Sequence, residues 1–457
     1  MSAVAPATRG TAEKDPSVQD NKGHVPSPAR HETPLQSILA RIVHVERNEI
    51  AALLLSFAYF FLVLAAYYII RPVRDEMGVA VGRDHLQTLF VIVFFVMLAA
   101  VPVYGWVTSR FAKRLVVPLV YSFFILNLIA FWTILSGGGR TASIASVFFV
   151  WASVFNLFVV SLFWIVMSDL YDSGQAKRLY GFIAAGGTAG AMAGPIITQG
   201  FVRIIGPDNL LLVSAALLTL ALVAAMLLRR LAPAHGLAVA SERPVGKGIL
   251  AGAIRVWQSP YLFRIALWIL LGNLVSTFFY LEQSHIVGET LTDRTARVEL
   301  LARLDLAVSI MTILLQVFVT GRMLERFGVG VTAATLPAWC ALGLVLLAIS
   351  PTLGVIVAIM AVERAVAFAL ASPAVKVLYT VVDPEEKYKA QNFIDTVVYR
   401  GGDAASGWVF NTLGKTLGLA GGVVALTAVP AALAWLWLSF SLGNQLKERT
   451  ASAGQNR

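Results

Sequence analysis

Twelve stretches of about 20 mostly apolar residues constrain the fold of this chain more than any other feature. A transmembrane helix needs about that length to cross a hydrocarbon core of roughly 30 Å. Hydrophobic residues make up 58% of the 457 residues and charged residues only 14%, which is too few to cover three soluble domains. We therefore predict an all-α membrane protein with twelve spans: 49–70, 87–107, 115–135, 142–168, 180–202, 210–228, 262–285, 304–321, 331–349, 353–378, 391–412 and 419–442.

The distribution of Lys and Arg predicts how these spans are oriented. With the N-terminus in the cytoplasm, 25 of the 36 basic residues fall in cytoplasmic segments and 9 on the opposite side, while Arg364 and Arg400 lie inside spans. We therefore expect a bacterial-type inner membrane with both termini cytoplasmic. These loops explain the net charge of +10, so we expect membrane lipids as partners and no nucleic acid.

The segments between the spans predict the domain organisation. Residues 1–34 are rich in Pro, Ala, Ser and charge, which is typical of a disordered tail. Apolar residues share one face of 35–47, which predicts an amphipathic interfacial helix, with a solvated extension of the first span as the alternative. The remaining predicted units are a six-helix bundle at 48–228, a cytoplasmic central loop at 229–261, a second six-helix bundle at 262–442 and a cytoplasmic tail at 443–457.

Two patterns recur at similar offsets in the two halves. Gly105, Ser109 and Arg110 correspond to Gly321, Glu325 and Arg326, 216 residues later. Asp172, Arg178, Phe182 and Gly190 correspond to Asp383, Lys389, Phe393 and Gly401, 211 residues later. This order indicates an internal duplication into two pseudo-repeats. Duplicated six-helix halves are a transporter plan in which the substrate site lies between the halves near the membrane midplane.

The first of these patterns resembles the Gly-x-x-x-Asp-Arg-x-Gly-Arg/Lys signature of the major facilitator superfamily. The resemblance implies the major facilitator fold over residues 49–442 and a secondary active transporter that works by alternating access. In that family the loop carboxylate caps a neighbouring helix end and pairs with a basic residue, which helps to hold one conformation closed. The resemblance therefore implies a latch at Glu325, whereas Ser109 supplies no charge in the first half.

Three short patches resemble the ATP/ADP antiporters of plastids and intracellular bacteria. They are Tyr67-Tyr68-Ile-Ile-Arg71-Pro-Val-Arg74-Asp75, Val160-Ser-Leu-Phe-Trp164 with the following Asp169 and 176–180, and Lys389-Ala-x-Asn-Phe-Ile394-Asp395. The resemblance implies an anionic solute, with ADP/ATP exchange as the first candidate. This chain differs from those antiporters in having no acidic residue between 142 and 168.

Polar residues repeat at helical spacing inside four spans. An ionisable residue at the centre of a membrane costs roughly 2.5–3.5 kcal/mol on insertion scales, so it faces the bundle interior, a partner or water. These stripes predict a shared aqueous cavity, with interhelical hydrogen bonding in a packed bundle as the alternative. The stripes are Tyr67, Arg71 and Arg74; Asn273, Thr277, Tyr280 and Ser284; Asp305, Ser309, Thr312, Gln316 and Thr320; and Asp395, Tyr399 and Asp403 with the neighbouring Arg400.

The arginines in and beside these stripes predict the chemistry of the substrate. Arginine recognises carboxylate or phosphate groups through two parallel hydrogen bonds, so we expect a small anionic substrate. The predicted binding residues are Arg71, Arg74, Arg364, Arg400, Tyr67, Asn273, Tyr280, Gln316 and Tyr399. The predicted coupling or gating acids are Asp305, Glu363, Asp395 and Asp403. Glu363 can either accept a coupling proton or pair structurally with Arg364 or Arg400.

Three glycines in the fifth span recur every fourth residue before a proline. Gly186, Gly190 and Gly194 therefore share one helix face and allow another backbone to approach closely. Two interpretations remain open, namely static tight packing and a hinge between gating helices. Arg110 and Arg326 are grouped with these glycines and with Glu325 as candidate gating residues because they belong to the repeated loop motif.

The sequence contains no complete motif for nucleotide hydrolysis or metal binding. Gly414-Lys415-Thr416 lacks the first glycine of a P-loop, and the single cysteine excludes an internal disulfide. We expect no enzymatic activity, no cofactor and no metal, and transport driven by a coupling ion or a counter-substrate. The alternatives are a proton-coupled transporter or efflux pump of another small molecule, and a membrane partner or sensor that no longer transports.

Overall fold

The described part of the chain is helical almost throughout. The computed structural model describes residues 49–111, 113–231, 245–417 and 421–455, and no strand occurs among them. The predicted tail at 1–34 and the interfacial helix at 35–47 lie outside the described residues. The prediction of an all-α fold is confirmed.

Six long helices form the N-terminal set, and their ends follow from local sequence. Thr141 begins α5 by accepting a hydrogen bond from the backbone of Ile144, and Asp172 forms a capping box with Gln175 at the start of α6. Glycine with positive φ follows the last turn of α2 and of α6. The helices are α2 (Ile50–Val81), α3 (Arg83–Arg110), α4 (Lys113–Ser136), α5 (Ala142–Leu170), α6 (Ser173–Ile205) and α7 (Leu210–Leu231).

The C-terminal set is more irregular, because three of its helical runs contain a π turn. Ser259 and Asp293 cap the starts of α9 and α10. The elements are α8 (Val245–Gln258), α9 (Pro260–Thr290), α10 (Arg294–Leu315), η1 (Gln316–Thr320), α11 (Gly321–Arg326), α12 (Gly328–Ile349), α13 (Leu353–Val366), η2 (Ala367–Ala371), α14 (Ser372–Leu378), η3 (Tyr379–Val381), α15 (Pro384–Phe393), η4 (Ile394–Val398), α16 (Tyr399–Leu417) and α17 (Gly421–Gln455). The π turns are η1, η2 and η4.

The helices match the predicted order of membrane spans. Among the described residues, eleven helical runs are long and apolar enough to cross a membrane. The remaining predicted span, 391–412, is helical as part of α15, η4 and α16, but it carries Asp395, Arg400 and Asp403. This span therefore has the required length but is more polar than the others.

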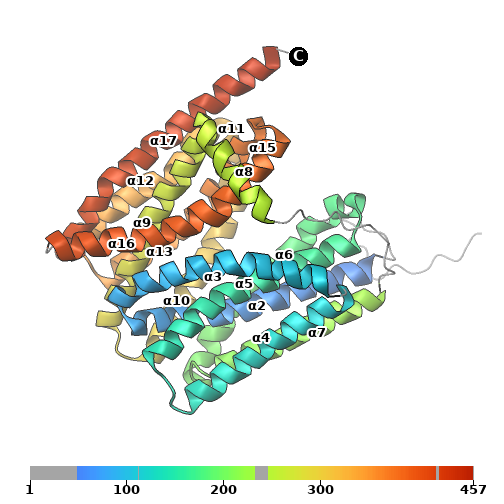
Figure 1. Ribbon diagram of the computed structural model, residues 1–457. Helices are drawn as coiled ribbons and strands as arrows, with labels where there is room; N and C mark the ends of the chain where they lie inside the picture. The colour runs from blue at the N-terminus through green and yellow to red at the C-terminus, as the bar shows by residue number, and fades with distance from the viewer. Residues whose placement is uncertain (1–48, 112, 232–244, 418–420, 456–457) are drawn as a thin grey trace, which may run out of the picture.

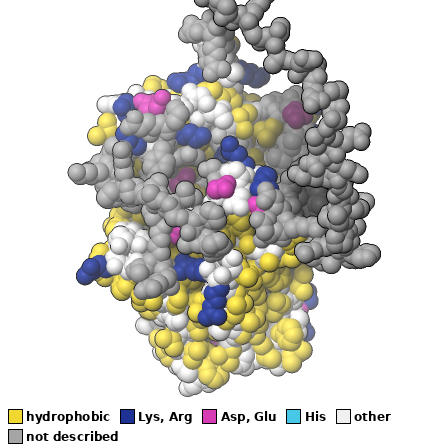
Figure 2. Space-filling view, turned by 90° about the vertical axis from the view of Figure 1, so that its right-hand side faces the viewer, with side chains coloured by type: hydrophobic (Ala, Val, Ile, Leu, Met, Phe, Trp, Pro, Cys, Tyr) yellow, Lys and Arg dark blue, Asp and Glu magenta, His cyan; other side chains and the backbone are white. Residues whose placement is uncertain are grey.

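The two sets lie side by side and separate toward one end (Figure 1). We call the end where α2 begins and α17 ends the terminal end, and the opposite end, where α2 stops at Val81, the distal end. The sets separate on the terminal side, where α8, α11 and α15 lie. Figure 2 looks onto this end and shows Lys and Arg side chains gathered around it, with hydrophobic side chains covering the lower part of the view.

Each set packs around its own apolar core. The N-terminal core is built mainly from α2, α4, α5 and α7, and it contains a buried hydrogen bond of 2.6 Å between the hydroxyls of Tyr59 and Tyr121. The C-terminal core is built mainly from α9, α12, α13 and α17, where the Trp268 indole donates to the Ser439 hydroxyl at 2.7 Å. These buried polar groups are paired, as burial in an apolar core requires.

The glycine stripe of α6 packs directly against α2. A Cβ added at Gly190 would lie 2.3 Å from the carbonyl oxygen of Phe61, and one at Gly186 would lie 2.5 Å from that of Phe57. At Gly194 an added Cβ would lie 2.6 Å from the Cβ of Tyr68. The expected close approach of another backbone is therefore present, and the role of these glycines as a hinge stays a prediction.

At three predicted boundaries the structure has more helix than was expected. The first span was expected to end at residue 70, but α2 continues to Val81, because the charged side chains that follow are paired inside the protein. The expected loop 229–261 contains α8, which packs so closely on α15 that a Cβ added at Gly252 would lie 2.3 Å from the Lys389 carbonyl oxygen. The expected tail 443–457 is helical in α17 as far as Gln455.

The close packing of α6 on α2 predicts a selective loss of stability in Gly190→Ala. The added methyl group must push the two backbones apart, and overpacking of this kind costs about 1–3 kcal/mol. Gly200→Ala is a matched control in the same helix, because nothing lies within 4 Å of its added Cβ. Thermal unfolding of the two purified variants should show a lower melting temperature for Gly190→Ala alone, and equal melting temperatures would contradict the packing argument.

Candidate functional site

A cavity of about 560 Å³ lies between the two sets of helices. Volumes of 300–1,000 Å³ are typical of sites for small organic ligands. Residues of α2, α3 and α5 line it on one side, and residues of α9, α13, α16 and the π turns η2 and η4 line it on the other. Wide π turns are frequent at functional sites, because they displace side chains from the regular α-helical register.

Three arginines form the floor of this cavity, and two aspartates, Asp75 and Asp305, contact them from behind. Arg71 of α2 and Arg364 of α13 both contact Oδ1 of Asp305 in α10, at 3.5 Å and 3.3 Å. The Asp305 side chain is 2% exposed, and its Oδ2 has no hydrogen-bond partner among the described residues. Because Arg71 belongs to the N-terminal set and Asp305 to the C-terminal set, this ion pair joins the two sets inside the membrane.

A second contact between the sets lies beside the first. Arg74 contacts Oδ1 of Asp75 at 2.6 Å, and the Tyr280 hydroxyl of α9 donates to the same oxygen at 3.1 Å. The Arg74 guanidinium also lies 5.2 Å from the centroid of the Phe149 ring, within the range of a cation–π contact. Arg74 is therefore held between a carboxylate and an aromatic ring.

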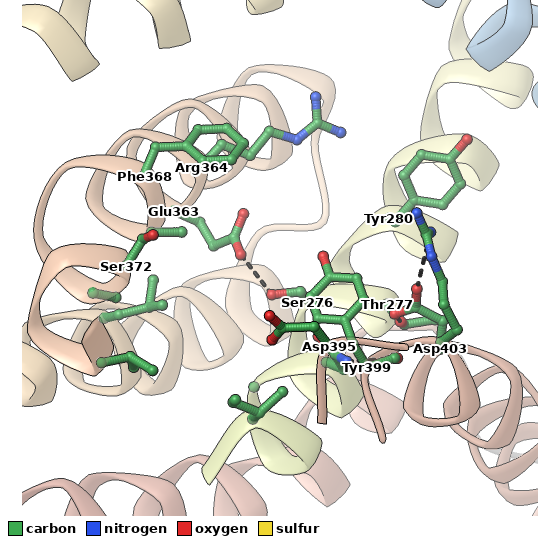
Figure 3. A pocket seen from close by; sticks show the side chains of 18 of the residues that line it. Ser276, Thr277, Tyr280, Glu363, Arg364, Phe368, Ser372, Asp395, Tyr399 and Asp403 are labelled. Atoms are coloured by element: carbon green, nitrogen blue, oxygen red, sulfur yellow. Dashed lines mark hydrogen bonds and ion pairs between the residues drawn. The ribbon is translucent and has the colours of Figure 1, made fainter. Parts of the chain in front are cut away.

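The wall formed by α9, α13 and α16 carries hydroxyl, amide and carboxyl groups. The Ser276 hydroxyl donates to Oε1 of Glu363 at 2.6 Å, and Arg400 lies 3.8 Å from Asp403. The side-chain amide of Asn273 donates to the Tyr399 carbonyl oxygen at 2.7 Å. In Figure 3 the Glu363 carboxyl points toward Ser276, whereas the Arg364 guanidinium extends away from it.

Closer to the terminal end, the cavity is lined by Lys376, Tyr379, Gln391 and Asp395. These residues belong to α14, η3, α15 and η4, the segments around the connection at 382–383. The cavity therefore extends from the arginine floor toward the terminal end, where the two sets of helices separate (Figure 1).

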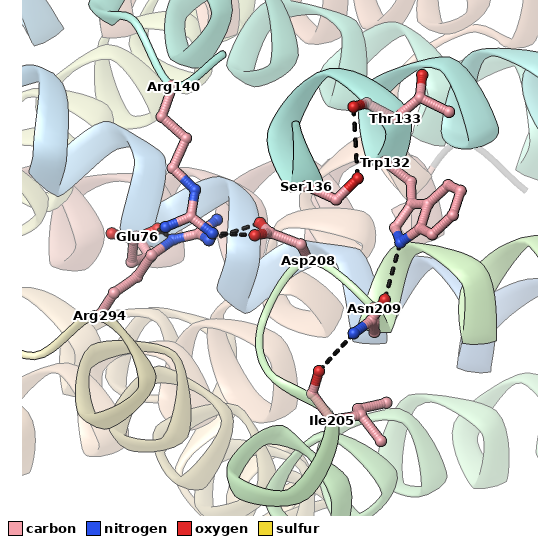
Figure 4. Close-up of polar contacts among 9 residues, drawn as sticks. All are labelled: Glu76, Trp132, Thr133, Ser136, Arg140, Ile205, Asp208, Asn209 and Arg294. Carbon is pink, nitrogen blue, oxygen red and sulfur yellow. Dashed lines mark hydrogen bonds and ion pairs between the residues drawn. The ribbon is translucent and has the colours of Figure 1, made fainter. Parts of the chain in front are cut away.

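Ion pairs close the distal end. Nε of Arg294, in the first turn of α10, contacts Glu76 of α2 at 2.7 Å, and its Nη1 contacts Asp208 of the α6–α7 connection at 2.6 Å. Arg140 pairs with the other oxygen of Asp208 (Figure 4). Arg203 of α6 contacts Glu299 of α10 at 2.6 Å. These contacts join the sets at one end only, so the structure is closed at the distal end.

The comparisons with known proteins agree with this architecture. The sequence model described as Major Facilitator Superfamily matches residues 165–407, which is more than half of the chain. The chain belongs to the Major Facilitator Superfamily. It is a multi-pass membrane protein, and its family is one of secondary transporters of small molecules.

Solved structures show the same fold at low sequence identity. The nucleoside transporter NupG is 14% identical with a TM-score of 0.62, and the alignment covers 86% of this chain and 99% of that one. A bacterial homologue of the iron transporter ferroportin, in an inward-facing state, is 12% identical with a TM-score of 0.61 over 87% and 98% of the two chains. A POT family transporter in complex with 5-aminolevulinic acid is 12% identical with a TM-score of 0.59 over 86% and 96%. No curated protein matches this facilitator by sequence.

The cavity brings together most of the residues that the sequence singled out. The predicted residues that line it are Arg71, Arg74, Asn273, Tyr280, Glu363, Arg364, Asp395, Tyr399, Arg400 and Asp403. Asp305 lies directly behind the floor and contacts it through Arg71 and Arg364. The predicted pairing of Arg400 with Asp403 is present, whereas Arg364 pairs with Asp305 and not with Glu363.

Two predicted binding residues lie elsewhere. Gln316, the first residue of the π turn η1, is exposed and is not among the residues that line the cavity. Thr320, at the end of the same predicted stripe, is buried and donates to the Ala369 carbonyl oxygen. Tyr67 packs on Phe155 in the N-terminal core and is not among the residues that line the cavity. Neither Gln316 nor Tyr67 is among the residues that line the cavity, and a binding role for them stays a prediction.

The repeated loop motifs lie at the terminal end, away from the cavity. Arg110, Glu325 and Arg326 are all exposed. Glu325 makes no hydrogen bond or ion pair with any described residue, and Arg326 lies over the ring of Phe327, 5.7 Å from its centroid. The expected pairing of Glu325 with a basic residue is therefore not formed among the residues that the structure describes.

The sequence patterns did not single out the residues of the distal network or a pairing role for Asp75. Glu76, Asp208, Arg294 and Glu299 were assigned to loops or span ends, where charged residues are ordinary. The sequence did indicate that ion pairs could form at this end, because the predicted distal segments of the two halves contain both acids and arginines. Deciding which acid pairs with which arginine requires the tertiary packing.

The distal network predicts that Arg294→Ala opens this facilitator at its distal end. The substitution removes the contacts with Glu76 and Asp208, whereas Arg297→Ala removes only hydrogen bonds to carbonyl oxygens of the adjoining α9–α10 segment. In a Cys340→Ser background, Ser284→Cys places a thiol at a buried position near the distal end of α9. Labelling of this thiol by a membrane-impermeant maleimide should rise several-fold in Arg294→Ala and stay unchanged in Arg297→Ala.

Proposed function

We propose that this facilitator carries a small solute whose anionic group binds Arg71, Arg74 and Arg364, and that it works by alternating access. The observation that carries the proposal is the floor itself, where three arginines share two carboxylates between the two sets of helices. Arginine in a partly enclosed site favours planar anions such as carboxylate and phosphate. An anion bound here would contact both sets at once.

The orientation in the membrane follows from the distribution of charge. Lys and Arg gather at the terminal end (Figure 2), whereas acids and arginines pair with one another at the distal end. The positive-inside rule then places the terminal end in the cytoplasm. We propose that the protein resides in a bacterial inner membrane with both termini cytoplasmic and that this structure is its inward-open state.

The ion pair between Arg71 and Asp305 supplies an exchange step. A bound anion offers the arginines a second partner and competes with the Asp305 carboxylate for Arg71 and Arg364. Release of Asp305 would free the two sets to rock about the site, because this pair joins them. The solute would therefore be needed for reorientation, which is the behaviour of an exchanger.

The nucleotide candidate rests on the resemblance of three sequence patches to ATP/ADP antiporters, and counter-flow tests it directly. Proteoliposomes preloaded with unlabelled ATP are mixed with labelled ADP. If nucleotides are carried, uptake requires internal nucleotide and falls at least about tenfold in Arg71→Ala, because removing one partner of a buried charge pair costs 2–5 kcal/mol. Arg230→Ala, at the exposed end of α7, should leave uptake unchanged.

Absence of ADP uptake by correctly folded protein would eliminate nucleotide exchange. The anion proposal would then be tested by the same counter-flow protocol with carboxylate and phosphate esters. It would be contradicted if a substrate were found whose transport survives Arg71→Ala combined with Arg364→Ala.

Proton coupling is a second candidate, and the buried Asp305 carboxyl favours it. Displacement from its two arginines would leave this carboxyl in a low-dielectric site, where the neutral form is favoured. Anion binding would then be linked to proton uptake. An imposed inward proton gradient should raise uptake in the wild type, and Asp305→Asn should transport without this response. If the proton gradient does not change uptake by either the wild type or Asp305→Asn, proton coupling is eliminated and strict exchange remains as the mechanism.

A further inference from the structure

We infer that the solute carries a cationic group as well as its anionic group, and that Glu363 pairs with that cationic group. The substrate class is then zwitterionic. This inference rests on the proposed function, because it concerns the same cavity. It goes beyond that function because it assigns a second binding group to the solute and a direct binding role to Glu363.

The total charge around the cavity argues against a polyanion. Within the described residues, five cationic side chains and three carboxyl side chains line the cavity, and Asp75 and Asp305 contact the floor arginines from behind. The formal charges of these groups cancel. A nucleoside polyphosphate would bring several negative charges into a cavity that has no excess of cations to pair with them. Unpaired charges are energetically costly in the low dielectric of such a site.

The charges cancel in total but not locally. The three floor arginines face only two carboxylates, Asp75 and Asp305, so the floor keeps one excess positive charge. On the wall, Arg400 and Asp403 balance each other at 3.8 Å. The excess on the floor is where the anionic group of the solute binds.

Glu363 is the unbalanced negative charge. Its side chain is 4% exposed, lines the cavity and accepts a hydrogen bond from Ser276, but it makes no ion pair with any described residue. Neighbouring residues on a helix point about 100° apart, and Arg364 is directed to Asp305 and makes no ion pair with Glu363. Figure 3 shows the two side chains diverging in this way. A cationic partner stabilises the charged form of a buried carboxyl group, and a bound solute can supply one.

The cavity therefore presents a positive floor and a negative wall within one enclosed space. A solute with an anionic group at one end and an ammonium group at the other satisfies both. Phe90, Phe149 and Phe368 supply apolar lining for the organic part of such a solute. A simple anion pairs only with the floor arginines and leaves Glu363 without a cationic partner.

Matched ligand sets test this assignment on the full-length protein in lipid nanodiscs. The first set contains amino acids and dipeptides, the second their N-acetyl derivatives, the third their methyl esters, and the fourth AMP and ADP. Ligand-induced thermal stabilisation, titrated to give affinities, ranks the sets. We expect binding from the first set, and N-acetylation or esterification of a binding member should weaken it at least about tenfold, because either change leaves a buried charge of the site unpaired.

Glu363→Gln separates a binding role from a structural one. The variant should bind the zwitterion and its N-acetyl derivative with similar affinity, so that the ratio of the two affinities falls to about one, since only the ammonium contact is lost. Glu289→Gln, which removes an exposed carboxylate near the distal end of α9, should keep the wild-type ratio. A structural role for Glu363 would lower the melting temperature or all affinities together and leave the ratio unchanged, which would overturn the inference.

The remaining outcomes separate this inference from the proposed function. Tighter binding of N-acetyl derivatives or of AMP and ADP than of zwitterions would overturn the zwitterion assignment and leave the anion site standing. Binding of methyl esters alone would overturn both. Failure of every set to stabilise folded, monodisperse protein would also count against both.

Discussion

The ion pair between Arg71 and Asp305 is the contact on which the rest of the structure depends. It lies inside the membrane, where a single unpaired charge is costly, and its partners belong to different halves of the molecule. Arg364 shares the same carboxylate oxygen, so one buried aspartate holds cations from both halves. The charges that a solute must recognise are thus the charges that hold the halves together.

Two rigid units follow from the packing around this contact. The glycine face of α6 allows the backbone of α2 to approach closely, so the helix that carries Arg71 is fixed within its own half. Cores of aromatic and aliphatic side chains hold each half separately. Between the halves, ion pairs in the interior and at the distal end lie beside apolar contacts, such as those of Val298 of α10 with the N-terminal core and of Leu281 of α9 with residues of α3. Ionic contacts between rigid units can exchange partners without repacking a core, which suits a rocking transporter.

The site could be predicted from the sequence where a regular helix was a valid assumption. Ten of the predicted residues line the cavity, and helical spacing gathered Arg71 with Arg74 and Tyr399 with Asp403 onto common faces, whereas Asp395 lies in the π turn η4. Gln316, which is exposed, and Tyr67, which packs against the N-terminal core, are not among the lining residues. Spacing along one helix contains no information about either placement.

Length, apolarity and the repeated motifs by themselves determined a helical membrane protein of the major facilitator type, because each span must satisfy its own backbone in lipid and can be recognised locally. Which charges meet was decided only by the tertiary structure. Arg294 pairs with Glu76 and Asp208. Glu363 accepts a hydrogen bond from Ser276, whereas the adjacent Arg364 pairs with Asp305. Ion pairing depends on distances of a few ångströms between helices far apart in the sequence, and only their packing sets those distances.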